Sequence, residues 1–81
     1  MRICFVCLGN ICRSPFAEQV GKRIVAARAI DMYVTSGGFL APGRQCPDQA
    51  IAAAGRAGYT LDCHRSRMVT ELAEEEATLF A

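Results

Sequence analysis

Short apolar runs alternate along this chain with longer stretches in which apolar residues recur at helical spacing. The runs at residues 3–6 and 32–36 are typical of buried parallel strands, and two glycines end the second run. Between the runs, an apolar series alternates with polar residues such as Glu18 and predicts an amphipathic helix whose apolar stripe faces the core. The series comprises Phe16, Val20, Ile24, Ala27 and Ile30. This helix is expected to begin at Pro15 and to end near Asp31.

The second half of the chain continues the alternation. A surface loop at 39–46 contains proline and glycine, and an alanine-rich helix is predicted at 47–58, packed closely on the sheet. Thr70 is expected to cap a short third helix, and 77–81 is interpreted as the beginning of a third parallel strand. This order predicts an α/β fold with a single domain over residues 1–81.

The composition describes a small soluble globular chain. A hydrophobic content of 52% and a net charge of +1 exclude a disordered chain and a nucleic-acid-binding chain. No stretch approaches the roughly 18 apolar residues of a membrane span, and the run at 3–8 is too short for a signal peptide. The odd number of cysteines favours free thiols, so we expect a cytoplasmic protein without a membrane partner.

Metal binding is not expected, and neither is a cofactor. Cys4 and Cys7 have the spacing of a metal knuckle, but residues three apart on a strand point to opposite faces. Apart from the adjacent Cys63 and His64, the chain has no second pair. We interpret Cys4, Cys46 and Cys63 as small buried or half-buried side chains.

The segment after the first predicted strand carries the most specific chemistry. It reads Cys7-Leu8-Gly9-Asn10-Ile11-Cys12-Arg13-Ser14. Backbone amides at a helix N-terminus can surround the oxygens of a phosphate, Arg13 can bind two of them, and the same field favours a Cys7 thiolate. Ser14 can cap the helix and donate to the sulfur when it leaves. Residues 8–13 are therefore predicted to form a phosphate-binding loop with Cys7 as the nucleophile.

These residues resemble the low-molecular-weight protein tyrosine phosphatases, whose mark is C-x5-R-S close to the N-terminus. Later landmarks follow in the family's order across essentially all 81 residues: Ser36-Gly37-Gly38, Pro47-Asp48, His64-Arg65-Ser66-Arg67 and Thr70-Glu71-Leu72. The resemblance implies a doubly wound parallel sheet with the strand order second, first, third. It also implies that Cys7 attacks a phosphotyrosine phosphorus and that water hydrolyses the resulting cysteinyl-phosphate.

The resemblance also implies roles for the other site residues. Arg13 would bind the phosphoryl oxygens, Ser14 would stabilise the leaving thiolate, and Cys12 would pair with Cys7 under oxidation. The implied hydrogen-bond network that holds the loop comprises Asn10, Ser36 and His64. The implied pocket walls are Leu8, Ile11 and either Phe39 or Leu40. From the residues alone, Phe39 either lines the entrance or packs under its own loop, and Arg44 is either a rim charge or solvated.

One departure from the family is large. The family takes its general acid from an Asp-Pro loop near the C-terminus, and nothing after Asp62 matches that loop. We therefore expect the front portion of the fold and a weakened activity. One alternative is a thioredoxin-coupled arsenate reductase, although Cys46 and Cys63 do not stand where its cysteine relay would be. A second alternative is a non-catalytic module that binds phosphate or phosphotyrosine.

The partners expected from these features are few. They are a phosphotyrosine protein or a small aryl phosphate as substrate, and a phosphate or sulfate ion in the loop. A third strand at 77–81 would also present an unpaired edge, so the chain is expected to self-associate through it.

Overall fold

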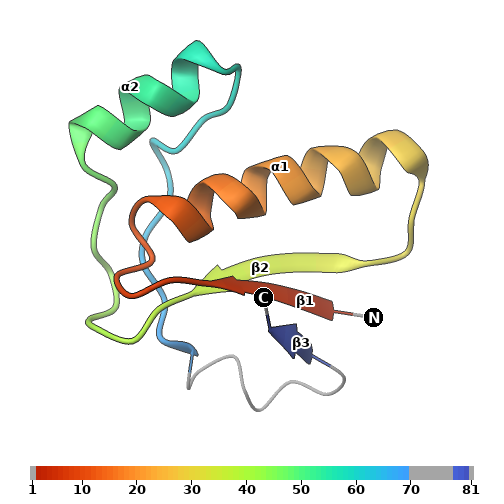
Figure 1. Cartoon of the computed structure of the whole chain (residues 1–81), viewed down its shortest axis with the longest axis horizontal. Helices are drawn as coiled ribbons and strands as arrows, with labels where there is room; N and C mark the ends of the chain where they lie inside the picture. The colour runs from red at the N-terminus through yellow and green to blue at the C-terminus, as the bar shows by residue number, and fades with distance from the viewer. Residues whose placement is uncertain (1, 70–77, 81) are drawn as a thin grey trace.

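The central strand of the sheet is formed by the N-terminal residues of the chain. The computed structural model describes residues 2–69 and 78–80. Its elements in chain order are β1 (Arg2–Val6), α1 (Arg13–Arg28), β2 (Tyr33–Gly37), α2 (Asp48–Arg56) and β3 (Thr78–Phe80). The strands are parallel and lie in the order β2-β1-β3 (Figure 1). The α/β class and the strand order expected from the sequence are therefore confirmed.

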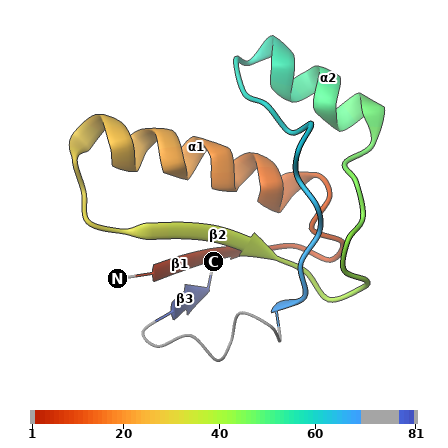
Figure 2. The same cartoon turned by 180° about the vertical axis from the view of Figure 1, so that it is seen from behind.

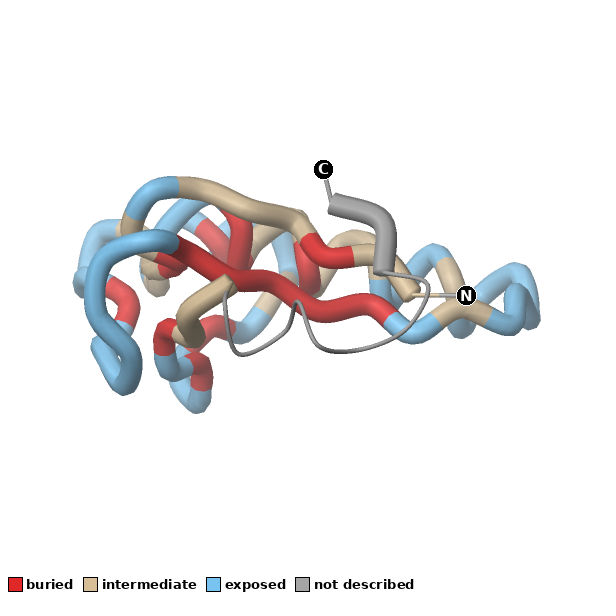
Figure 3. The backbone as a smooth tube through the Cα atoms, turned by 90° about the horizontal axis from the view of Figure 1, so that it is seen from below, coloured by how far each residue is buried: buried red, intermediate tan, exposed pale blue. Residues whose placement is uncertain are grey.

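The two helices in the described part of the chain lie on the same side of the sheet (Figures 1 and 2). α1 packs directly on β1 and β2, and Gly21 permits the close approach. A Cβ at Gly21 would lie 3.1 Å from Cγ1 of Val34 and 3.2 Å from the ring of Phe5. β2 is buried from Val34 to Gly37 (Figure 3). The third helix expected after Thr70 falls outside the described residues.

α2 packs on the beginning of α1, whereas its alanine-rich sequence predicted close packing on the sheet. Ala54 of α2 is buried together with Cys46 and Leu61, and Phe16 and Tyr59 pack against this cluster. The rings of Phe16 and Tyr59 meet edge to face with 5.3 Å between their centroids. This small second core holds the segment that follows α2 beside the first turns of α1.

α1 corrects four expectations. It begins at Arg13 rather than Pro15, and its N-cap residue is Cys12 without a side-chain cap, so Ser14 lies inside the first turn and does not cap the helix. The apolar stripe is core only in the first half, since Ile24 is 48% exposed. The physical reason is the face of α1 that lies on the sheet. That face carries the buried Ser14 and Glu18 and the glycine at 21, and Ile24 is rotated away from it. Glu18, expected on the polar face, is 1% exposed.

Candidate phosphate-binding site

The loop between β1 and α1 is held in place by contacts to the end of β2. The backbone N–H of Cys7 donates to the carbonyl of Gly37 at 3.3 Å, and the N–H of Phe39 donates to the carbonyl of Leu8 at 2.8 Å. Asn10 has a φ of 54°, a left-handed conformation that asparagine tolerates better than most residues. The loop therefore lies at the carboxyl end of the parallel strands, where open α/β sheets bind ligands.

Cys7 has a hydrogen-bond partner suited to a thiolate. Its Sγ lies 3.0 Å from Oγ of Ser14. Burial alone would raise the pKa of Cys7. Hydrogen bonds from the Ser14 hydroxyl and from the backbone of Ser14, Asn10 and Gly9 outweigh it and hold this pKa below its usual value. The loop thus favours the nucleophilic form of the sulfur.

Asn10 lies at the centre of the hydrogen-bond network and is fully buried. Its Nδ2 donates to Oγ of Ser14 at 2.8 Å and to Oγ of Ser36 at 2.9 Å. Its Oδ1 accepts from the backbone N–H of Arg67 at 2.8 Å. Its carbonyl oxygen lies 2.8 Å from Nε2 of His64, which must donate because a carbonyl only accepts. The structure therefore brings together the three network residues named from the sequence.

His64 is buried, and its burial lowers its pKa. A neutral imidazole carries one N–H, and the contact with Asn10 assigns it to Nε2. His64 therefore acts as a fixed donor that clamps the carbonyl of the left-handed loop residue. This geometry suits a structural support of the loop rather than a proton carrier.

Two cationic side chains stand near the loop. Arg13 is exposed at the first residue of α1 and makes no ion pair with a described residue. Arg44 projects towards Gly9, since a Cβ at Gly9 would lie 3.5 Å from its Nη1. The backbone of Arg44 is fixed on both sides by Ser66, which accepts from its N–H and donates to its carbonyl, each at 2.8 Å. Arg44 is therefore a rim charge, which the sequence had left open.

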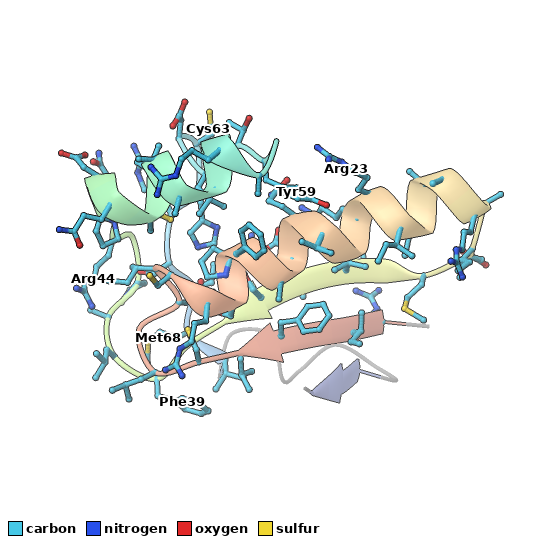
Figure 4. The ribbon with its side chains drawn as sticks, turned by 45° about the horizontal axis from the view of Figure 1, so that its top comes forward. Arg23, Phe39, Arg44, Tyr59, Cys63 and Met68 are labelled. Carbon is cyan, nitrogen blue, oxygen red and sulfur yellow. The ribbon has the colours of Figure 1, made fainter. Side chains whose placement is uncertain are left out.

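The rim also carries exposed apolar side chains. Leu8, Phe39 and Leu40 are 59%, 55% and 53% exposed, and Ile11 is half-buried. Phe39 and Met68 lie at the end of the molecule that carries the loop (Figure 4). Phe39 is thus exposed beside the loop and does not pack beneath its own segment. An apolar rim around an anion-binding loop suits a ligand that combines a phosphate with a ring.

The sequence interpretation missed Glu18 and the pairing of Arg67. Both oxygens of the buried Glu18 carboxylate accept hydrogen bonds, from Ser36, from Lys22 at 2.6 Å, and from Nη2 of Arg67 at 3.4 and 3.5 Å. Arg67 anchors its segment to α1 through this pairing. The available signal was the spacing: Ser14, Glu18 and Lys22 follow one another at intervals of four residues on one helix face.

A cavity of about 390 Å³ lies on the far side of this network from Cys7. Its polar lining includes Glu18, Lys22, Cys63, His64, Arg65 and Arg67. Within residues 2–69 and 78–80, no group of three histidine, cysteine or acidic side chains is arranged to hold a metal ion. Cys4 and Cys46 are buried as expected, but Cys63 is exposed. No helix among the described residues is long and apolar enough to cross a bilayer.

Comparison with known proteins gives one consistent family. The family model for low molecular weight phosphotyrosine protein phosphatases matches residues 2–79. The chain is 38% identical over 80 residues to a protein-arginine-phosphatase of Bacillus subtilis, which covers 98% of this chain and 53% of that protein. It is 33% identical over 73 residues to a low molecular weight phosphotyrosine protein phosphatase of Sus scrofa, covering 85% of this chain and 46% of that protein.

Solved structures agree with these sequence matches. A crystal structure of a YwlE mutant from Bacillus subtilis superposes with a TM-score of 0.82 at 31% identity, covering 99% of this chain and 55% of that one. A low molecular weight protein tyrosine phosphatase from T. tengcongensis superposes with a TM-score of 0.80 at 30% identity, covering 99% and 57%. The chain thus spans about half the length of the curated relatives it matches.

Proposed function

Since this chain belongs to the low molecular weight phosphotyrosine protein phosphatase family, we propose that it hydrolyses aryl phosphate monoesters, phosphotyrosine in proteins foremost, through a phosphorylated Cys7. The observation that carries the proposal is the 3.0 Å contact between Cys7 Sγ and Ser14 Oγ in a loop that lowers the pKa of Cys7. The mechanism needs Cys7 as a reduced thiol, which fits a reducing, cytoplasmic setting.

The reaction proceeds in two steps, phosphorylation of Cys7 and hydrolysis of the phosphocysteine. The Cys7 thiolate attacks phosphorus, the bond from phosphorus to the phenolic oxygen breaks, and the phenolate leaves with the electron pair. Water then attacks the phosphocysteine, releases inorganic phosphate and restores the thiolate, while its proton passes to solvent. Arg13 and the loop amides bind the phosphoryl oxygens in both steps, and Ser14 donates to sulfur as it departs.

The rim favours an aromatic phosphate over the phosphoarginine that the Bacillus relative's name indicates. Exposed Leu8, Phe39 and Leu40 provide apolar surface for a phenyl ring. The guanidinium of Arg44 stands beside Gly9, where it would meet the charged group of a phosphoarginine side chain. Phosphoarginine remains the second candidate because the relative is 38% identical over 98% of this chain.

Arsenate reduction is less well supported. Such chemistry requires a second thiolate that attacks Cys7, and burial raises the pKa of Cys46, with a further contribution from Cys12. Cys63 is exposed and lines the cavity on the other side of the network. A phosphate-binding module without catalysis is an outcome of the test below.

The test compares four substrates: p-nitrophenyl phosphate, an alkyl phosphate, a phosphotyrosine peptide and a phosphoarginine peptide. A general acid typically contributes about 10²–10⁴ in rate to a poor leaving group, whereas p-nitrophenolate leaves without protonation, so p-nitrophenyl phosphate should be turned over far faster than an alkyl phosphate. Cys7→Ser should abolish turnover, and Arg13→Ala should weaken vanadate binding measured by calorimetry. Vanadate binding without turnover of any substrate would leave only the binding module, and turnover by Cys7→Ser would refute the cysteine mechanism.

A further inference from the structure

Glu18 is a buried carboxylate that lies behind the phosphate-binding loop, one helical turn after Ser14. It is 1% exposed, yet its pKa is lowered. Burial alone would raise this pKa, but hydrogen bonds from Lys22 and Ser36 and the charges of Lys22 and Arg67 reverse the effect. The carboxylate is therefore ionised at neutral pH. A buried charge of this kind is costly and calls for a physical reason.

The contacts of Glu18 require an acceptor on both of its oxygens. Oε1 accepts from the hydroxyl of Ser36 and from Arg67 at 3.5 Å. Oε2 accepts from Nζ of Lys22 at 2.6 Å and from Arg67 at 3.4 Å. These donors come from α1, β2 and the segment after α2, and His64 from that same segment also feels the charge. No neutral side chain of the same shape offers acceptors in both directions.

The Glu18 carboxylate stands at the start of a series of hydrogen bonds that leads to Cys7, and the N–H of Arg67 on Oδ1 of Asn10 fixes the amide in that series. Ser36 has a single proton and donates it to Glu18, so Ser36 can only accept from Asn10. Asn10 Nδ2 uses its two protons on Ser36 and Ser14. Ser14 accepts there, and when Cys7 is a thiolate its own proton must point to the sulfur 3.0 Å away, because a thiolate only accepts. With Cys7 in that form, every donor between Glu18 and the sulfur is assigned.

We propose that Glu18 is a positioning residue that polarises the relay of Ser36, Asn10 and Ser14 and so keeps a hydrogen-bond donor on the sulfur of Cys7. The inference deepens the proposed function and rests on it for its purpose, because a phosphatase needs this sulfur as a thiolate in both steps. Glu18 touches neither the substrate nor the reacting atoms. Its action passes entirely through the three side chains between it and Cys7.

If Glu18 acts through the relay, its removal should shift the pKa of Cys7 in one direction, and if it acts only through its electrostatic field, the shift should have the opposite sign. A negative charge near a thiolate raises the thiol pKa, so removing the Glu18 charge should lower the pKa of Cys7 if only the field acts. If Glu18 instead orients the relay, its removal weakens the Ser14 donor and raises the pKa of Cys7. The direction of the shift therefore separates positioning from simple electrostatics.

The decisive variant is Glu18→Gln, which keeps the shape but turns one acceptor into an NH₂ donor that faces either Ser36 or the cations. The rate of iodoacetamide alkylation of the Cys7 peptide, followed by mass spectrometry against pH, gives the pKa of Cys7. We expect a rise of about half a unit to one unit, since a full hydrogen bond to a charged group corresponds to about one to two units and the variant weakens the Ser14 donor without removing it. Asp31→Asn removes an exposed charge beyond the far end of α1 and should leave the titration unchanged.

A second variant keeps the test decisive if Glu18→Gln fails to fold. Ser36→Ala leaves the Lys22 and Arg67 ion pairs intact and cuts the relay, so it should raise the pKa of Cys7 by a similar amount. Because the relay is serial, Glu18→Gln should add little to Ser36→Ala in the double variant. An unchanged or lowered pKa of Cys7 in Glu18→Gln, or in Ser36→Ala, overturns the proposal. Alkylation needs no turnover, so an inactive chain with the expected titration would refute the proposed function alone.

Discussion

Gly38 offers a direct test of how tightly the phosphate-binding loop is held. A Cβ added at Gly38 would lie 2.9 Å from both Cβ and backbone N of Asn10, and 3.0 Å from the carbonyl carbon of Gly9. Gly38 itself cannot retreat, because its N–H donates to the carbonyl of Arg67 at 2.7 Å and its carbonyl accepts from Val69 at 2.8 Å. The substitution Gly38→Ala must therefore displace the loop.

The size of the effect follows from these distances. Ordinary contacts between carbon atoms begin near 3.5 Å, so the Gly9-Asn10 backbone must move by roughly half an ångström. Overpacking of this kind destabilises a fold by about 1–3 kcal/mol. The displaced segment also contains amides that would bind phosphate and the Asn10 side chain that contacts Ser14. We therefore expect a loss of vanadate affinity in addition to the loss of stability.

Urea unfolding followed by circular dichroism, together with vanadate calorimetry, measures both effects. Gly55→Ala is the matched control, because a Cβ there meets nothing within 4 Å and Gly55 lies inside α2. That control should be stabilised by about 0.5–1 kcal/mol and should bind vanadate like the parent. A Gly38→Ala chain that unfolds at the parent's urea concentration and binds vanadate equally well would show that the loop is not held as described.

Three further predictions concern pH, oxidation and assembly. Burial lowers the pKa of His64 below its ordinary 6.5, and the pKa of Glu18 lies below its ordinary 4.5. Both groups therefore bind protons more readily in the unfolded chain, so the free energy of unfolding should fall as the pH drops below 6.5 and again below 4.5. Urea titrations that give the same free energy from pH 7 to pH 4 would contradict this. Brief peroxide treatment should link Cys7 to Cys12, and peptide mapping that finds Cys7 as stable sulfinic acid would refute the pairing. Among described residues β3 pairs only with β1, which leaves its other edge unpaired there. Light scattering should therefore show self-association that rises with concentration and is weakened by Leu79→Lys. A monomer at every concentration would rule out association through this edge.

The sequence predicted those features of the fold that depend on residues close together along the chain. Strands and helices follow from apolar spacing, and the loop that begins at Cys7 follows from its place between the first strand and the first helix. The burial of Glu18 escaped this reasoning, because apolar spacing cannot reveal a carboxylate whose donors lie 18 and 49 residues away. The exposure of Ile24 also escaped it, since the face of α1 that lies on the sheet carries Ser14 and Glu18 rather than the apolar stripe.

The contact between Asn10 and Arg67 joins residues 57 positions apart, and it has a kinetic consequence. The strand, loop and helix around Cys7 are local and can form early, whereas closing so long a stretch of chain carries a large entropic penalty before any contact rewards it. The clamp on Asn10 therefore arrives late in folding. Until it does, the loop that carries the donors of Cys7 is not clamped in place, so a nascent or locally opened chain should present a less reactive sulfur to oxidants and alkylating agents than the folded chain does.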